Sequence, residues 1–535
     1  MVKDTYVKLR DRLTTMIKAK YPYVYLVSEE EDRVLNYLSD VCASRQTGCY
    51  VFDASLGWKG ISDWLVSTEI EEGEEIPNIL NAQSLIDAFT NILDFEEDNG
   101  GVFVIPDFHQ YLQLMDPSPL IIYRNLKWLA PRLRSQNKMI VMISTSSDIP
   151  HEISNIIHVE DVDSPSLQEI REDLDETLKI SGETKIPESI RDKVARAALG
   201  LNLAQANRLF YEAIVSDLRE PNKWVNTVVA GKKGIIAASG SLEFFSPDEC
   251  PRDLAGLEEL KKWLSVRRSA FTKEAEAYNL PQPKGVGLIG IPGTGKSLTA
   301  KYIAGEWGLP LIRFDIGAVF GSLVGQSEEN MRKALKLAES IAPCILWIDE
   351  IEKAFPKDAL GGDAGTSTRV LANFLTWLQE HKDPVFVVAT ANDVQKLPPE
   401  LLRKGRFDEV FFLDLPSEIE RKEIFNVHLK RVKRDPTKYN LDKFVTNSKD
   451  FVGAEIEQAV KEALYKAFSD EPSREPSDDD VLEALNEIVP LSETRKPDID
   501  NLRGLVERKE VRNASLTTEE KRKSKPVSRP KPETS

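Results

Sequence analysis

Eight residues near the middle of the chain have the types and the spacing of a phosphate-binding loop. Gly290 to Ser297 reads Gly-Ile-Pro-Gly-Thr-Gly-Lys-Ser, which matches the pattern G-x-x-x-x-G-K-[ST] between an apolar stretch and a helix-forming run. In such a loop the backbone N–H groups face the phosphates, the lysine neutralises their charge, and the last hydroxyl is offered to Mg²⁺. The residues predicted to contact a nucleoside triphosphate are Pro292, Gly293, Thr294, Gly295, Lys296, Ser297 and Leu298.

Two carboxylates follow an apolar segment further along the chain. Cys344 to Ile348 has the composition of a buried strand, and Asp349 and Glu350 come directly after it. Ligands of parallel α/β sheets bind at the carboxyl ends of the strands. Asp349, together with the hydroxyl of Ser297, is therefore predicted to hold Mg²⁺, and Glu350 to polarise the attacking water. The alternative is an acidic strand end without a chemical role.

Three further polar residues complete the candidate site. Asn392 ends another apolar segment, where its amide would reach the γ-phosphate or the attacking water, or would only cap the turn. Arg403 and Arg406 lie three positions apart on a short turn beside a glycine. Two guanidinium groups in this arrangement suit a phosphate bound across a subunit boundary, which would make hydrolysis depend on assembly. The alternative is a surface turn with solvated arginines.

Apolar, strand-like segments alternate with helical patterns, and the order of elements occurs twice. The expected strands of the first copy are 23–28, 49–53, 102–105, 140–145 and 156–159, and those of the second are 285–291, 311–315, 344–349, 385–390 and 410–414. Each copy ends in a Pro-Ser step and helical segments, which predicts a small helical lid. The expected fold class is α/β, with a parallel-sheet nucleotide-binding module and its lid preceded by a second module of the same kind. The alternative is that any two α/β modules share such spacing.

The first copy lacks the residues that a phosphate needs. Its first strand runs into Ser28-Glu-Glu-Glu-Asp, without a glycine or a lysine, and these carboxylates would repel a phosphate. Pro106-Asp107 occupies the position of the acidic pair and loses the expected metal ligand. We therefore expect the first module to bind no nucleotide.

Composition shifts along the chain predict five regions. Residues 216–250 are rich in Gly, Ser and Lys, which predicts a linker with Val228 to Ala237 as a β-hairpin. The end of the chain is basic and rich in Pro and Ser, which predicts a disordered tail that is solvated or bound to an acidic partner. The expected regions are 1–215, a degenerate α/β module; 216–250, the linker; 251–416, the nucleotide-binding subdomain; 417–495, its lid; and 496–535, the tail.

The bulk composition narrows the function classes. Among 535 residues, 70 are basic and 87 acidic, and a net charge of −17 argues against a broad nucleic-acid footprint. The four cysteines form no C-x-x-C pair, and His151-Glu lacks the second histidine of H-E-x-x-H, so a zinc site is not predicted. The N-terminus has no apolar signal segment and no stretch is long enough to span a membrane. A cytoplasmic location is therefore expected.

Six motifs together resemble the AAA subgroup of the AAA+ ATPases. Besides the phosphate loop, they are Asp253-Leu-Ala-Gly-Leu, Ile348-Asp-Glu, Thr390-Ala-Asn, Arg403-Lys-Gly-Arg-Phe-Asp and Val452-Gly-Ala-Glu, in the order and spacing of that family. The resemblance covers about residues 253–494.

The resemblance implies ATP and Mg²⁺ as ligands and gives the motif residues their roles. Leu254 and Gly256 would lie against the adenine, Asp349 and Glu350 would form the Walker B pair, and Asn392 would be sensor 1. Arg403 and Arg406 would be arginine fingers, because members of the family usually work as ring hexamers. The layout of both modules also resembles the AAA ATPases encoded as hypothetical reading frames in plastids and cyanobacteria, which implies a photosynthetic host and, for a plastid-encoded chain, the chloroplast stroma.

One motif departs from the family pattern. The pore loop of the AAA subgroup carries an aromatic residue before Val-Gly, and this chain has Leu323 there. Leucine presses on a threaded polypeptide with less area and no stacking. Phe320 would substitute for it or belong to the core, and the loop from Gly361 to Thr368 is expected to be a second pore loop. Three functions stay open: a machine that remodels a protein partner, an ATP-dependent scaffold or switch, and an ATPase stimulated by nucleic acid.

Overall fold

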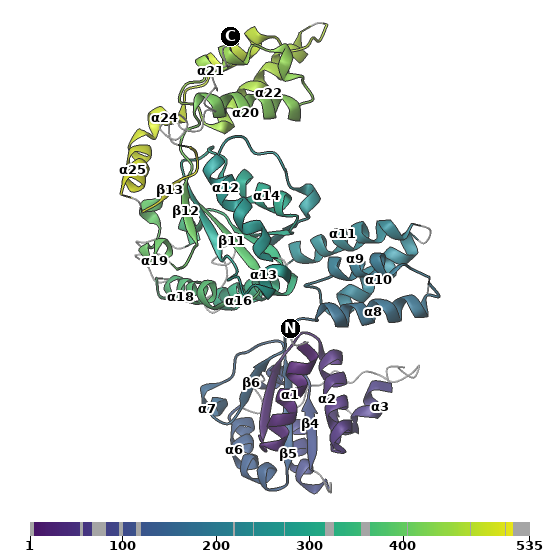
Figure 1. The fold of residues 1–535 in the computed structure, drawn as a ribbon. Helices are drawn as coiled ribbons and strands as arrows, with labels where there is room; N and C mark the ends of the chain where they lie inside the picture. The colour runs from purple at the N-terminus through teal and green to yellow at the C-terminus, as the bar shows by residue number, and fades with distance from the viewer. Residues whose placement is uncertain are drawn as a thin grey trace, which may run out of the picture. The chain divides into compact units, whose positions relative to one another are not determined.

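The chain forms two compact units in the computed structural model, Met1–Val229 and Ala230–Ser535 (Figure 1). The structure describes residues 5–53, 57–66, 82–95, 100–113, 119–183, 185–217, 220–238, 240–271, 273–315, 326–354, 364–403, 405–470, 472–508 and 510–516. Both pore-loop residues named above, Phe320 and Leu323, lie outside these ranges, as does the start of the expected second pore loop at Gly361. None of the described helices is long and apolar enough to cross a membrane.

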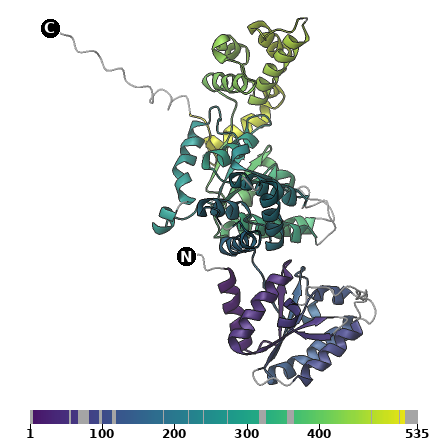
Figure 2. The ribbon, with the colours of Figure 1, turned by 90° about the vertical axis from the view of Figure 1, so that its right-hand side faces the viewer.

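The first unit contains a parallel sheet with one antiparallel edge strand. The strands in spatial order are β3 (Gly57–Gly60), β2 (Gly48–Asp53), β4 (Gly101–Ile105), β5 (Lys138–Ser144), β1 (Tyr23–Val27) and β6 (His158–Asp161), with β3 antiparallel to β2. Side chains alternate between the two faces, and the residues of both faces are buried. Tyr23 and Tyr25 face α4 (Ala82–Asn91) and α6 (Pro119–Ser135), whereas Val24 and Leu26 face α1 (Thr5–Lys18) and α2 (Glu31–Arg45), so helices cover both sides (Figure 2).

The second unit contains a larger sheet of the same kind. Its strands in spatial order are β13 (Arg512–Asn513), β12 (Glu409–Phe412), β8 (Gly285–Ile289), β11 (Val385–Ala391), β10 (Cys344–Ile348), β9 (Leu311–Phe314) and β7 (Leu242–Phe245), with β7 antiparallel to β9. One face packs against α12 (Glu258–Arg267) and α14 (Lys296–Trp307) through Trp263 and Trp307. The helices α16 (Gln326–Ile341) and α18 (Ala364–Glu380) lie on the other side of the sheet (Figure 1).

The two sheets share one topology. When the parallel strands β1, β2, β4, β5 and β6 of the first module and β8 to β12 of the second are numbered in chain order, both sheets have the order 5-1-4-3-2, with the antiparallel strand beside strand 2. The expectation of two α/β modules is therefore confirmed. The observed strands begin and end within a few residues of the expected ones, because buried parallel strands read as short apolar runs between turn residues.

Helices follow each sheet. They are α8 (Leu167–Ile180), α9 (Glu188–Ala197) and α10 (Leu203–Ser216) in the first unit, and α20 (Glu418–Arg431), α21 (Leu441–Asn447), α22 (Gly453–Ser469) and α23 (Asp478–Glu487) in the second. The first helix of each set opens with a capping box, at Ser166 and at Ser417, which explains the Pro-Ser steps in the sequence. We call the helices α20 to α23 the lid.

Shorter helices connect these elements: α3 (Ile61–Val66), α5 (Phe108–Gln113), α7 (His151–Ser154), α13 (Lys273–Ala277), α17 (Ile351–Ala354), α19 (Pro399–Leu402) and α24 (Leu491–Thr494).

The expected β-hairpin at Val228 to Ala237 is wrong. This segment belongs to a helix, α11 (Trp224–Ala237), and β7 also lies within the expected linker. Trp224, Val228, Lys232 and Ile236 recur every four residues and are all buried, which is the pattern of one helix face. The glycines of the segment obscured this period in the sequence.

The expected disorder beyond Lys496 is wrong for the residues up to 516. They form α25 (Lys496–Glu507) and β13, and Ile499, Leu502 and Ala514 are buried. A composition argument missed these few apolar residues because most of their neighbours are charged. Residues 517–535 lie outside the described ranges. The other expected domain boundaries stay predictions.

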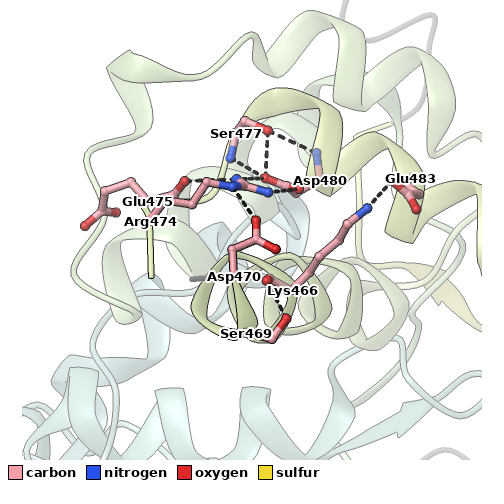
Figure 3. A network of polar contacts seen from close by, with 8 residues as sticks. All are labelled: Lys466, Ser469, Asp470, Arg474, Glu475, Ser477, Asp480 and Glu483. Carbon is pink, nitrogen blue, oxygen red and sulfur yellow. Dashed lines mark hydrogen bonds and ion pairs between the residues drawn. The ribbon is translucent and has the colours of Figure 1, made fainter. Parts of the chain in front are cut away.

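An ion-pair network holds the loop between α22 and α23 (Figure 3). The Arg474 guanidinium donates to both oxygens of Asp480, at 2.5 and 2.8 Å, and to Asp470 at 2.7 Å. Asp480 is buried and also accepts hydrogen bonds from the hydroxyl and the backbone N–H of Ser477. These contacts, that of Arg474 first, hold the pKa of Asp480 well below its usual range. The loop therefore ends in a buried carboxylate that belongs to the capping box of α23.

We predict that Asp480→Asn loosens the lid. The lost ion pair should lower the local free energy of unfolding by about 1 to 3 kcal/mol, measured at neutral pH as faster amide hydrogen exchange in α23. Glu483→Gln removes only the exposed pair with Lys466 and is the matched control. Because the folded-state pKa of Asp480 is lowered, its contribution is complete above about pH 4 and is lost as the pH falls toward that folded-state pKa. Unchanged exchange in Asp480→Asn would contradict the prediction.

Candidate nucleotide-binding site

A cavity of about 420 Å³ lies at the carboxyl ends of the strands in the second unit. Most of the predicted site residues line it: Leu254, Pro292, Gly293, Thr294, Gly295, Lys296, Ser297, Leu298, Asp349, Glu350 and Asn392. They come from segments that are far apart in the chain and meet because the parallel strands β8, β10 and β11 end at the same edge of the sheet. Gly256, Arg403 and Arg406 are not among the lining residues.

The loop between β8 and α14 needs its glycines for conformation and for space. Gly293 and Gly295 have φ values of 83° and 93°, a region that favours glycine. A side chain on Gly293 would come within 2.7 Å of Val452 Cγ2, in the segment that opens lid helix α22. The carbonyl of Gly293 also accepts the N–H of Ala454 at 3.1 Å. The phosphate loop therefore contacts the lid directly.

Lys296 is a buried cation at the floor of the cavity. Only 6% of its surface is exposed, and its Nζ donates to the carbonyls of Gly290 and Ile291 at 2.7 and 2.8 Å. Burial lowers the pKa of Lys296 to about 8, because a low-dielectric surrounding disfavours the charged form. An anion beside it would offset that cost. The lysine thus fits a phosphate.

Oxygen donors for a metal ion lie next to the loop. Asp349 Oδ1 is 3.5 Å from Ser297 Oγ and accepts the hydroxyl of Thr390 at 2.6 Å, while its Oδ2 is 3.4 Å from the Arg313 guanidinium. Mg²⁺ is usually held by one or two protein oxygens together with substrate phosphates and water. In the described part of the chain no three His, Cys, Asp or Glu residues form a metal cluster. The donor set therefore fits Mg²⁺ bound with a nucleotide better than a zinc cage.

Glu350 and Asn392 form the polar wall of the cavity. Asn392 Nδ2 donates to Glu350 Oε1 at 2.8 Å, and the backbone N–H of Asn392 donates to Glu352 at 3.0 Å. Glu350 has a positive φ of 49°, and its N–H donates to the hydroxyl of Thr390 at 3.1 Å. The Glu350 carboxylate is therefore held in a fixed orientation, which suits a group that orients a water molecule and takes up its proton.

The two arginines lie away from the cavity of their own chain. Arg403 follows α19 and is exposed, and Arg406 Nη1 donates to the carbonyl of Leu375 in α18 at 2.7 Å. Neither residue lines the cavity of its own chain. Their expected role toward a neighbouring subunit stays a prediction.

Gly256 has a different position from the one expected. Its neighbours Ala255 and Leu257 line the cavity, whereas its own N–H donates to Glu423 at 2.9 Å. It has a φ of 65°, and a side chain there would come within 2.7 Å of Glu420. Gly256 therefore permits the tight turn that presents Leu254 and Leu257 to the cavity.

Several lining residues escaped the sequence analysis. Ile424, His428 and Arg431 lie on one face of lid helix α20, and Glu457 of α22 faces the same cavity. Burial lowers the pKa of His428, because it disfavours the charged form of the imidazole. Their helical spacing is visible in the sequence, but any buried helix face has that spacing. Ser515, the last residue of this group, carries no sequence signal.

The corresponding edge of the first module carries its own negative charge. Glu30 follows β1, and its carboxylate accepts the N–H of Leu203, the first residue of α10, at 2.7 Å and pairs with Arg33 at 3.0 Å. Asp107 has a φ of 47°, close to that of Glu350, after the corresponding strand. Burial and the neighbouring Asp107 raise the pKa of Glu31 to about 7. The chain thus supplies a carboxylate next to its own helix N-terminus. That this module binds no nucleotide stays a prediction.

Comparison with known families gives matches along most of the chain. Residues 286–415 match the ATPase family associated with various cellular activities (AAA). Residues 9–162 match the N-terminal domain of SpoVK-like AAA ATPases, and residues 168–239, which contain α8 to α11, match the second domain of the same group.

Full-length similarity is found with algal proteins. The chain is 39% identical over 502 residues to the "Uncharacterized AAA domain-containing protein ycf46" of Guillardia theta, which covers 94% of this chain and 95% of that protein. The protein of the same name from Pyropia yezoensis is 38% identical over 506 residues, or 94% and 99% of the two chains. The "Cell division cycle protein 48 homolog" of Archaeoglobus fulgidus is 34% identical over 217 residues, 39% of this chain and 29% of its own. The chain therefore belongs to the AAA ATPases, in the group of the ycf46 AAA domain-containing proteins, and it hydrolyses ATP.

Proposed function

We propose that this ATPase remodels or disassembles a protein partner and that it works as a ring of identical copies, with six as the expected number. The observation that carries the proposal is the position of Arg403 and Arg406. The cavity contains the other predicted catalytic residues, Glu350 and Asn392, but no arginine from this turn. A neighbouring copy that supplied the missing guanidinium groups would complete the site, and an arginine of this kind contributes about 10³- to 10⁵-fold in phosphoryl transfer.

The proposed mechanism assigns each described group one task. Lys296 and the N–H groups of the loop bind the β- and γ-phosphates, and Ser297 and Asp349 hold Mg²⁺. The metal ion, when bound, neutralises charge on the phosphates. Glu350, oriented by Asn392, aligns the attacking water and takes up its proton. The products are ADP and phosphate.

Direct contact between the phosphate loop and the lid supports a mechanical output. Ala454 donates to Gly293, and residues of α20 and α22 share the cavity with the loop. A change in the ligand at the loop therefore acts on the lid without an intermediate element. The first module, which has no phosphate loop, is proposed to bind the partner or to support the ring. The proposed location is the cytoplasm, or the chloroplast stroma if the chain is plastid-encoded.

An ATP-dependent scaffold or switch is the second candidate function. Leu323 favours it, because the pore position lacks the aromatic side chain that grips a threaded polypeptide. In this alternative, ATP sets the state of assembly, and hydrolysis only resets it.

We predict that two inactive variants restore each other's activity. Glu350→Gln keeps Arg403 but lacks the general base, and Arg403→Ala keeps Glu350 but lacks the finger, so each variant alone should lose about 10²-fold or more of its turnover. In equimolar mixed rings, about a quarter of the interfaces combine an intact Glu350 with an intact Arg403 of the neighbour. Phosphate release should therefore reappear on mixing.

Arg196→Ala, which changes an exposed arginine of the first unit, is the control and should behave as the wild type. Light scattering in the presence of ATP checks that the variants assemble. Full ATP turnover by Arg403→Ala would contradict the proposal that two subunits share the site. So would mixtures that form mixed rings but hydrolyse ATP no faster than either variant alone.

We predict that substitutions at Leu323 distinguish the two candidate functions. If the ring threads its partner, an unfolded polypeptide such as β-casein should raise the rate of ATP hydrolysis, Leu323→Ala should abolish this stimulation, and Leu323→Tyr should strengthen it. The basal rate without polypeptide should stay the same in all three proteins. Equal stimulation of wild type and Leu323→Ala would favour the switch over threading.

A further inference from the structure

The chain returns to the nucleotide-binding subdomain after the lid. We call the described residues 496–508 and 510–516 the C-terminal strap. Its helix α25 buries Ile499 in a small apolar cluster with Ile291, the second residue of the phosphate loop, and Val452, which caps lid helix α22. The strap therefore contacts the joint between the sheet and the lid rather than extending into solvent.

A bidentate ion pair fastens α25 next to the cavity. Arg503 Nε and Nη2 donate to the two oxygens of Asp414, each at 2.9 Å. Asp414 lines the cavity and is 18% exposed, so the pair is partly shielded from water. Two parallel charge-assisted hydrogen bonds define direction as well as distance.

The end of the strap becomes part of the sheet. Arg512 and Asn513 lie parallel to Phe411 and Phe412 of β12. Ala514, which is fully buried, donates to the carbonyl of Phe412 at 2.9 Å, and its own carbonyl accepts the N–H groups of Glu259 and Leu260 at the start of α12. These two N–H groups belong to the first turn of the helix, which otherwise leaves its donors unsatisfied.

Ser515 then reaches a buried carboxylate at the wall of the cavity. Its hydroxyl donates to Glu420 Oε1 at 2.6 Å, and the same oxygen accepts the N–H of Leu257 at 3.3 Å. Only 4% of Glu420 is exposed. Burial alone would raise the pKa of Glu420, but the hydrogen bonds from Ser515, Ser417 and Leu257 outweigh it and the pKa is lowered. Glu420 is therefore a charged acceptor that these donors hold in place.

The position of this contact indicates which part of a nucleotide it serves. Gly293 to Ser297 define the phosphate end of the cavity, whereas Leu254, Ala255 and Leu257 are apolar and suit the flat face of a purine. Glu420 is hydrogen-bonded to Leu257, so Ser515 supports the base end and not the phosphate end.

We propose that the C-terminal strap is a structural wall of the ATP site, in which Ser515, acting through Glu420, positions the turn from Leu254 to Leu257 against the purine base. Ser515 is a positioning residue, and affinity for the nucleotide depends on a segment that follows the lid in the chain. This inference rests on the proposed nucleotide site and adds the determinant of its base end.

The test measures binding of mant-ADP, a fluorescent nucleotide, and of tripolyphosphate, which has phosphates but no base, by competition. Removal of residues 511–535 deletes β13, Ala514 and Ser515, whereas removal of 517–535 leaves the described strap intact and is the matched control. Ser515→Ala and Ser515→Thr test the hydroxyl in the full-length chain, and Ser469→Ala, at an exposed lid serine, is the control for a serine change.

We expect Ser515→Ala to weaken mant-ADP binding about 10-fold, from the loss of a hydrogen bond to a charged group, with affinity for tripolyphosphate unchanged. Ser515→Thr should restore binding, and the deletion of 511–535 should weaken it further than the point change. The deletion of 517–535 and Ser469→Ala should bind as the wild type does.

Equal mant-ADP affinity in Ser515→Ala and wild type would overturn the proposal, as would a parallel loss of tripolyphosphate binding, because the effect would then not be at the base end. Lys296→Ala serves as the reference for the phosphate end and should lose both ligands. If the wild type itself bound neither mant-ADP nor tripolyphosphate, the proposed nucleotide site would fail and not only the role of the strap.

Discussion

The buried ammonium group of Lys296 sets the main physical constraint on this structure. A cation that is 6% exposed must be compensated by nearby polar atoms or by an anion, and its neighbours here are two carbonyls of its own loop. The loop can wrap around it only because Gly293 and Gly295 adopt positive φ values. The glycines that shape the phosphate site also let the lid approach, since a side chain on Gly293 would collide with Val452.

The first module has the same sheet topology as the second but no lysine at the position of Lys296. Its sheet has the strand order of the second module, but Glu30 lies after its first strand and accepts the N–H at the start of α10. A carboxylate of the chain thus lies where helix N–H groups would otherwise attract an anion. The link between this sheet and helix α10 is therefore made by groups of the chain itself.

The lid and the C-terminal strap both contact the phosphate loop or the wall of its cavity. Ile499 of the strap, Val452 of the lid and Ile291 of the phosphate loop share one apolar cluster, and Ser515 and Asp414 bring two hydrogen-bonded groups to the cavity wall. Parts of the chain on either side of the lid thus meet at the same site. These contacts are closely packed, and packed contacts tolerate little deformation.

Local sequence determined the ten expected strands, the phosphate loop and the acidic pair, because each depends on residues close together: short apolar runs, glycines at required φ values, and carboxylates directly after a buried strand. Predictions that depended on the average composition of a segment, those of the linker and of disorder in residues 496–516, were wrong. Glycines hid the buried face of α11, and charged neighbours hid Ile499, Leu502 and Ala514 in the strap. Only the tertiary structure decided that Arg403 and Arg406 lie outside their own cavity and that Ser515 reaches Glu420. These positions depend on contacts between residues far apart in the chain, which no local pattern encodes.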